Sequence, residues 1–327
     1  MQLLDHLHSD ALFEAAPDVD RVDSDEPEAL DESDALTLPP LDARTAADHL
    51  PLDTRFRLRD TITPIQWAFL HKHGFLVFAR VVSTDEVAHV LAEIDRVEKK
   101  LIDEKIDKIY GVPVWFGVGP DGQKWLQRVG FASVYSDWLD AFVQDRRFEP
   151  VRRLIGEDAR IGTREKDGVV FNRYCNMPGS VRPDLAWHTD ALRDVFYNRR
   201  MPGPMLNVGL HFDRIRPEDG GLRVLPGTHM QTAFETLFRK IHFVTNDDDP
   251  DEVMVETWPG DLTVHDGRMW HRVKSSPFVG LRSLRRSMYV PYVVDRPQPK
   301  NENSGTMAYL RGLDFVMKLR ARRAGVR

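Results

Sequence analysis

The chain has little cysteine: Cys175 is the single one among 327 residues. One cysteine excludes an internal disulfide and any all-thiolate metal site, so a metal in this protein must be held by histidines and carboxylates. The lack of disulfides also suits a reducing compartment. We therefore expect a cytoplasmic protein.

The sequence also lacks long apolar runs and an excess of positive charge. No apolar stretch approaches the roughly 18 to 20 residues of a membrane span, and Met1–Glu14 has none of the features of a secretory signal. The net charge of -6 gives no basic field to attract a phosphate backbone. We therefore expect neither a membrane nor a nucleic acid as partner, but a small-molecule substrate.

The first part of the chain is acidic. Residues 16 to 60 are rich in Asp, Glu and Pro and poor in apolar periodicity, which predicts that residues 1–60 form a disordered or loosely packed segment. An arm that binds a partner or covers a site is the alternative. A single domain is expected over 61–327, beginning with a helix at Thr61–Gly74, a strand at Phe75–Arg80 and a helix at Thr84–Asp103.

Beyond Gly156 the sequence consists of short segments rich in Val, Ile, Leu and aromatic residues, separated by Pro, Gly and Asp. This pattern is typical of antiparallel strands without helical crossovers, and it predicts a mainly β fold with flanking helices, a closed sandwich or jelly roll with its core at about 165–295. One helix near 231–240 interrupts the strands. A C-terminal helix at about 306–323 would serve packing or dimerisation, which leaves monomer and homodimer open. The candidate strands are Val169–Met177, Met205–Asp213, Leu222–Leu225, Val253–Trp258, Leu262–His265 and Arg286–Val294.

Three copies of the pattern His-x-Asp compete for a metal site. On a strand, this spacing places the ring and the carboxylate on one face. The copy His8–Asp10 lies in the acidic segment, where rigid geometry is not expected. Asp213, in the copy His211–Asp213, leads into a turn and is explained as a structural carboxylate. The copy His188–Asp190 follows the turn-rich stretch 178–184, which places it at the rim of the barrel, so we favour it.

A third ligand is needed, and His271 is the best candidate. It ends a turn, a strand and a bend that return the chain to the rim, with His265 as its competitor. Two histidines and one aspartate form the facial triad of non-haem iron(II) oxygenases, which leaves positions for a bidentate oxoacid and dioxygen. Zinc is the alternative metal. A zinc ion would be coordinated by four ligands, and a zinc site would favour hydrolysis.

The distal carboxylate of an oxoacid needs a fixed cation, and arginine supplies a forked, always-charged one. Arg285 and Ser287 stand two apart on a predicted strand, so both are expected to face the pocket and grip that carboxylate. A register slip of one residue would exchange the roles of Arg285 and Arg286.

Several of these motifs, in order and at similar spacing, resemble those of the phytanoyl-CoA dioxygenase family, and the pattern is also similar to ectoine hydroxylases. The resemblance implies a double-stranded β-helix, iron(II), 2-oxoglutarate and O2 as cosubstrates, ascorbate as an optional reductant, and hydroxylation of an unactivated carbon. By position, His188, Asp190 and His271 match the metal ligands, Arg285 matches the oxoacid-binding arginine, and Arg173 matches a position that lines the pocket. The motifs are Pro178–Gly179, Trp187–Asp190, Asp219–His229, Gly260–Asp266, Trp270–His271 and the Arg-Arg-Ser of residues 285–287.

Two departures from the family pattern affect oxoacid binding: Arg272 and Val273 replace a Gly-Ser pair after His271, and the spacing to Arg285 is slightly long. The presence of Asp190 favours hydroxylation over halogenation, because halogenating relatives lack this carboxylate. The stretch 191–204 is expected to form a loop over the metal. Five of its side chains could grip an anionic substrate: Arg193, Phe196, Tyr197, Arg199 and Arg200.

The sequence therefore predicts an iron(II)- and 2-oxoglutarate-dependent dioxygenase that hydroxylates a small metabolite and releases succinate and CO2. Oxidative desaturation or ring closure on the same scaffold is the alternative within enzymes. A jelly-roll protein that binds a small molecule, with a structural metal or none, is the alternative outside them.

Overall fold

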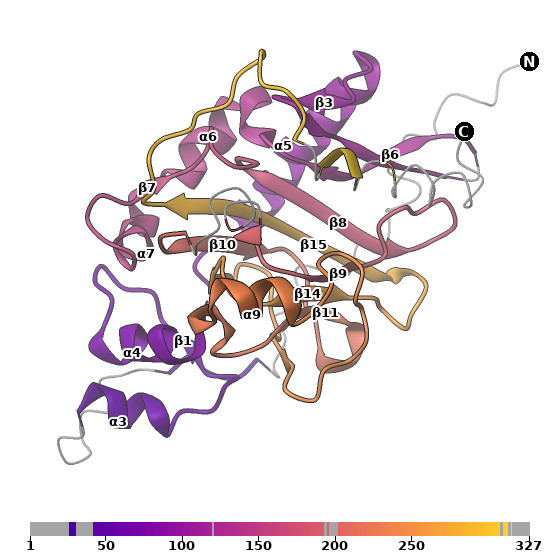
Figure 1. Ribbon diagram of the computed structural model, residues 1–327. Helices are drawn as coiled ribbons and strands as arrows, with labels where there is room; N and C mark the ends of the chain where they lie inside the picture. The colour runs from indigo at the N-terminus through magenta and orange to yellow at the C-terminus, as the bar shows by residue number, and fades with distance from the viewer. Residues whose placement is uncertain are drawn as a thin grey trace, which may run out of the picture.

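The computed structural model describes residues 26–30, 42–119, 121–192, 195, 202–307, 310–312 and 315. Two largely antiparallel sheets make up most of the fold (Figure 1). Strands of both sheets line one cavity. This is the jelly roll that the sequence predicted. No helix in the described part of the chain is long and apolar enough to cross a membrane.

The larger sheet has the strand order β1-β2-β13-β10-β15-β8-β6-β5, with β7 paired to β15. Its centre is β15 (Gly280–Val293), which pairs antiparallel with β10, β8 and β7. Because side chains alternate between the two faces, each strand sends one set toward the cavity and the other toward the helices. The remaining strands are β1 (Arg55–Phe56), β2 (Phe75–Phe78), β5 (Trp115–Val118), β6 (Lys124–Val129), β7 (Arg160–Ile161), β8 (Val170–Asn176), β10 (Met205–His211) and β13 (Leu262–Asp266).

The smaller sheet has the order β12-β11-β14-β9. Its strands are short, and β14 lies between β11 and β9. A separate hairpin, β3 (Lys108–Ile109) and β4 (Val112–Pro113), stands apart from both sheets. The four strands of the smaller sheet are β9 (Leu185–His188), β11 (Gly221–Val224), β12 (Val253–Met254) and β14 (His271–Lys274).

Helices cover the outer face of the larger sheet, and α5 (Thr84–Asp103) is the longest of those described. It begins at a capping box formed by Ser83 and Glu86 and buries an apolar stripe at helical spacing against the sheet. Its bounds agree with the sequence prediction. The other helices are α3 (Ala43–Asp48), α4 (Pro64–His73), α6 (Asp137–Val143), α7 (Glu149–Arg153) and α9 (Ala233–Phe238), with short 3-10 turns at Ala132–Tyr135, Arg146–Phe148, Pro217–Asp219 and Thr228–Met230.

The segment before residue 61 corrects one expectation. Residues 42–60 were predicted to be disordered or loosely packed, yet they contain α3 and β1, and β1 extends the larger sheet beside β2. Arg55 is buried and pairs with Asp261 at 2.7 Å, and Phe56 is fully buried in the core. Burial of this pair and of Phe56 outweighs the polar composition of the surrounding residues. Residues 1–25 and 31–41 lie outside the described part of the chain.

Other predicted elements agree in type but differ in extent. Helix α4 begins three residues after the predicted start because Thr63 is its N-cap, and it ends at His73, followed by the C-cap Gly74, whose φ of 84° favours glycine. Strand β15 starts at Gly280, earlier than predicted, and β12 stops at Met254. The predicted strand list did not include β9 and β14, which carry the candidate ligands. The predicted C-terminal helix at 306–323 falls mostly outside the described residues.

Candidate metal centre

The strand pairing of the smaller sheet brings the three predicted ligands together. His188 ends β9, His271 begins β14, and the two histidines are direct partners across this antiparallel pair. Asp190 follows His188 by two residues. One ligand atom from each of the three lies within 4.8 Å of the others, so the group could hold a metal ion.

The backbone fixes which ring nitrogen each histidine presents. The Nδ1 atoms of His188 and His271 lie 2.9 and 3.0 Å from the carbonyl oxygens of Ala186 and Met269. A carbonyl can only accept, so each Nδ1 carries the proton and each Nε2 is left as a lone-pair donor. The two Nε2 atoms lie 3.9 and 3.7 Å from the carboxylate oxygens of Asp190. This set of donors fits iron(II) in a facial triad.

Burial sets the charge of these groups before any metal binds. It lowers the pKa of both His188 and His271, which keeps the imidazoles neutral, as a ligand must be. Burial alone would raise the pKa of Asp190, but the surrounding histidines outweigh this effect and hold that pKa below its usual range. The site therefore offers an ionised carboxylate and two neutral rings.

Asp190 is oriented by groups from the larger sheet. The Nδ2 atom of Asn207, on β10, donates to Asp190 Oδ2 at 2.9 Å. His265 lies opposite Asn207 on β13, and its Nε2 is 3.8 Å from the same oxygen. His265 thus lies next to the carboxylate. The group that could hold a metal ion consists of His188, Asp190 and His271, without His265.

The third copy of the His-x-Asp pattern is structural, as the sequence analysis favoured. Asp213 accepts hydrogen bonds from the backbone N–H of Arg286, at 2.5 Å, and from its Nη2, at 2.7 Å. His211 is buried and its Nε2 lies 2.9 Å from the hydroxyl of Thr263. The first copy, His8–Asp10, lies outside the described residues.

The predicted oxoacid-binding residues do not line the cavity in the described structure. Arg285 is buried, and its guanidinium donates to three backbone carbonyls, those of Ser283, Lys274 and Pro183. Ser287 is also buried, opposite Asn172 of β8. On β15, Arg285 lies on the same face as the cavity residue Tyr289, and Arg286 lies on the opposite face, where it binds Asp213. This is the alternation of faces that the sequence predicted.

The prediction for Arg173 was wrong. Its side chain points to the helix-covered face of the larger sheet, where Nη1 lies 2.9 Å from Glu98 of α5. Its neighbours on β8, Asn172 and Tyr174, line the cavity instead. Alternation along a strand explains this, since a residue between two inward-facing neighbours must face outward.

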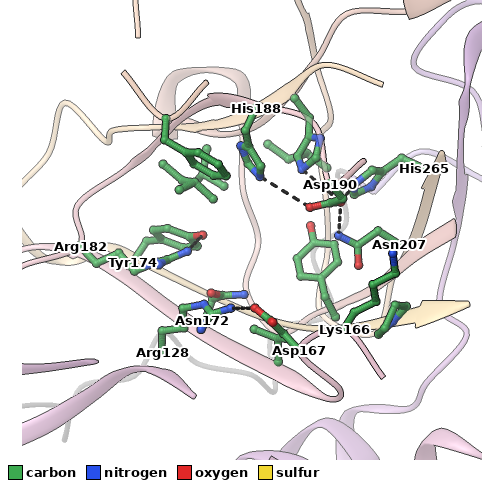
Figure 2. Close-up of a pocket in the computed structure, with 18 of the residues that line it drawn as sticks. Arg128, Lys166, Asp167, Asn172, Tyr174, Arg182, His188, Asp190, Asn207 and His265 are labelled. Atoms are coloured by element: carbon green, nitrogen blue, oxygen red, sulfur yellow. Dashed lines mark hydrogen bonds and ion pairs between the residues drawn. The ribbon is translucent and has the colours of Figure 1, made fainter. Parts of the chain in front are cut away.

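Figure 2 shows the cavity beside the triad, with several polar residues that the sequence analysis did not single out. Arg182 is the most buried of the cations, at 3% exposed, and precedes β9 in an irregular turn. No periodicity marks such a residue, and the stretch 178–184 had been treated only as a turn. The five residues predicted to contact substrate lie outside the described part of the chain: Arg193, Phe196, Tyr197, Arg199 and Arg200. Other polar lining residues include Arg128, Asp167, Asn172, Tyr174 and Asn207.

Two buried histidines and one partly buried carboxylate beside a cavity of a jelly roll define the class of mononuclear non-haem iron oxygenases. The family model described as Phytanoyl-CoA dioxygenase (PhyH) matches residues 70–276, well over half of the chain. The chain therefore belongs to the phytanoyl-CoA dioxygenase family of iron- and 2-oxoglutarate-dependent enzymes. No curated protein sequence matches it.

Solved structures support the fold. HygX from Streptomyces hygroscopicus, with nickel and 2-oxoglutarate bound, is 18% identical with a TM-score of 0.52 over 77% of this chain and 95% of HygX. The epimerase SnoN, in complex with Fe3+, alpha ketoglutarate and nogalamycin RO, is 19% identical with a TM-score of 0.51 over 75% of this chain and 87% of SnoN. The carbocyclase SnoK from nogalamycin biosynthesis is 19% identical with a TM-score of 0.50 over 79% of this chain and 90% of SnoK. At these identities the likeness is one of fold.

Proposed function

We propose that the protein oxidises a small molecule at an iron(II) ion held by His188, Asp190 and His271, with 2-oxoglutarate as cosubstrate. The most direct outcome is hydroxylation, with release of succinate and CO2. The convergence of two Nε2 atoms and one carboxylate beside a cavity carries this proposal. The bound metal and oxoacid would supply the activation of dioxygen.

The protein's own residues would contribute orientation and the exclusion of water. The carbonyls of Ala186 and Met269 fix the imidazole rings, and Asn207 fixes the carboxylate. Phe243 packs on His188 with 4.9 Å between the ring centroids and lines the cavity. It shields one side of the site, which would keep bulk water from the reacting atoms.

The walls of the cavity support a small-molecule substrate with polar groups. Arg128 and Asp167 form an ion pair at 2.5 Å on the wall, and Tyr289 and Met205 supply less polar surface. A mixed lining of this kind binds an apolar body and orients it by a few polar contacts. The substrate is expected to be a metabolite that fits this cavity beside 2-oxoglutarate.

Desaturation, cyclisation or epimerisation would use the same metal and cosubstrate. SnoN is named as an epimerase and SnoK as a carbocyclase, so the fold accommodates these outcomes in other proteins. Mass analysis of the product separates them, because hydroxylation adds one oxygen atom, desaturation or ring closure removes two hydrogens, and epimerisation changes neither.

Succinate release tests the proposal. Purified protein would be incubated with iron(II), ascorbate, 2-oxoglutarate and a panel of metabolites, and succinate would be measured by mass spectrometry. We expect slow release without substrate and faster release with a suitable one, and none from Asp190→Ala. Failure of every condition to yield succinate, or equal release by Asp190→Ala, would contradict the proposed function.

A further inference from the structure

The segment of residues 243–252, called the edge segment below, lies along the strand that holds one metal ligand. The backbone N–H of Phe243 donates to the oxygen of Trp187 at 2.8 Å, and the N–H of Trp187 donates to the oxygen of Thr245 at 3.0 Å. Trp187 belongs to β9, which is the last strand of the smaller sheet and ends at His188. The edge segment therefore extends the sheet beyond the strand that carries this ligand.

The side chain of Phe243 turns from this edge to the cavity. Its ring lies 4.9 Å from the ring of His188, measured between the centroids, and it lines the cavity wall. The backbone φ of Phe243 is 61°, in the left-handed region that a residue with a β-carbon rarely adopts. Such a conformation persists where the surrounding contacts hold it. The contacts of the edge segment should therefore decide where this ring lies.

Arg272 binds the edge segment at three places. It follows the ligand His271 on β14, and it lies on the opposite face of the sheet because side chains alternate along a strand. It is 1% exposed, and its Nη1 donates to the backbone oxygen of Asn246. Its Nη2 lies 2.6 Å from a carboxylate oxygen of each of Asp248 and Glu252. This arginine stands where the family pattern has glycine, so the anchor belongs to this chain's own sequence.

Trp187 completes the anchor. The guanidinium carbon of Arg272 lies 4.9 Å from the centre of the Trp187 ring, and the indole Nε1 donates to the backbone oxygen of Asp247 at 3.0 Å. Arginine suits this position, because its planar cation can stack on an aromatic ring and donate several hydrogen bonds at once. One face of the β9–β14 pair thus carries the two ligand histidines, and the other face carries Trp187 and Arg272, which fix the edge segment.

We propose that Phe243 is a specificity-determining residue that limits the size of the substrate beside the metal, and that Arg272 is a positioning residue that acts through Phe243. This inference rests on the proposed function. An aromatic ring on a cavity wall excludes larger ligands by steric overlap, and its removal leaves space that such a ligand can fill. Release of the edge segment from Arg272 would remove the contacts that hold Phe243 in its left-handed conformation. Both changes should therefore admit larger ligands.

The experiment uses two bidentate metal-binding probes of different size, acetohydroxamate and benzohydroxamate. Each would be titrated into cobalt(II)-loaded protein, and binding would be followed by the visible absorption of cobalt, which needs no turnover. Phe243→Ala should raise the affinity for benzohydroxamate relative to acetohydroxamate by about 10-fold or more, the effect of added space in an apolar pocket. Arg272→Met should change this affinity ratio in the same direction.

The double variant Phe243→Ala/Arg272→Met separates the proposed role from a general loss of structure. If Arg272 acts through Phe243, the double variant should have the affinity ratio of Phe243→Ala alone. Glu252→Gln weakens the same anchor from the edge segment and should give a smaller change in the same direction, and Arg272→Lys should keep part of the wild-type behaviour. Lys274→Met is the matched control, because Lys274 pairs with Asp248 at 2.6 Å from a partly exposed position, and it should keep the wild-type ratio.

Cobalt affinity and the thermal unfolding midpoint show whether the metal site and the fold of each variant are intact. The inference is overturned if Phe243→Ala binds benzohydroxamate no more tightly than wild type does, or if folded Arg272→Met keeps the wild-type ratio. If Arg272→Met does not fold, Glu252→Gln decides the role of Arg272 by the same criterion. Additive changes in the double variant would overturn the assignment of Arg272 as a residue that acts through Phe243. Wild-type protein that binds no cobalt(II) would instead contradict the proposed function.

Discussion

The hydrogen bond from Asn207 to Asp190 offers a test of how the larger sheet supports the metal site. Asn207→Leu keeps the approximate volume of the side chain and removes the donor that lies 2.9 Å from Asp190 Oδ2. A hydrogen bond to a charged group contributes about 1.5 to 3 kcal/mol, which corresponds to roughly 10- to 150-fold in a dissociation constant. Metal affinity should fall by about this factor, within the range found when partners of metal ligands are removed.

The assay is an anaerobic competition titration of iron(II) against a coloured chelator, with wild type and variant at equal concentration. Asn172→Leu is the matched control, because Asn172 lines the same cavity from β8 and donates no hydrogen bond to Asp190 in the described structure. It should bind iron(II) as wild type does. The reasoning is refuted if Asn207→Leu binds iron(II) with unchanged affinity, or if both variants lose the same factor.

Three further predictions concern stability and reactivity. Arg55→Met leaves the buried carboxylate of Asp261 without its cation, so the free energy of unfolding measured in urea should fall by about 3 to 5 kcal/mol. In the control Lys99→Met, which removes an exposed pair with Asp103, it should fall by under about 1 kcal/mol. Equal losses in the two variants would contradict the assignment. Burial lowers the pKa of His211 to about 3, so the unfolded chain binds the extra proton below about pH 6.5 and stability should fall as pH decreases, by up to about 1.4 kcal/mol per unit. Unfolding of wild type and His211→Gln at about pH 7 and about pH 5 checks this, since the variant should lose that part of the pH dependence, and an unchanged dependence would argue against it. Burial also raises the pKa of Cys175 to about 12, so iodoacetamide should label this thiol in denaturant and not in the folded protein; rapid labelling of folded protein would show that the cysteine is accessible.

Local signals in the sequence predicted α5 accurately. Its capping box lies at the first residues, and its apolar residues repeat every three or four positions. Residues close together in the sequence therefore determine both the start of the helix and its buried face. The metal triad was predicted from a different kind of signal. The spacing of His188 and Asp190 is local, but His271 joins them through the pairing of β14 with β9. The turn, strand and bend before His271, and then the order of the family motifs, carried that part of the prediction.

Errors arose where side-chain direction or long-range contacts decide the outcome. Arg173 sits one residue from two cavity-lining positions, and a shift of one residue on a strand exchanges the two faces. Arg55 finds its partner 206 positions along the chain, so the composition of its neighbours gave no sign that it would be buried. Arg182 lies in an irregular turn, where no periodicity indicates which way a side chain points.

The most direct test of the account is the stoichiometry of iron(II) binding by wild type, Asp190→Ala and Asp213→Asn. All three would be titrated anaerobically, and bound iron would be measured after gel filtration, with thermal unfolding to confirm that each variant is folded. We predict one iron(II) per chain for wild type and for Asp213→Asn, because Asp213 binds the guanidinium of Arg286 and not the metal. We predict no bound iron(II) for Asp190→Ala. Full iron binding by folded Asp190→Ala, or its loss from folded Asp213→Asn, would contradict the assignment of the metal centre.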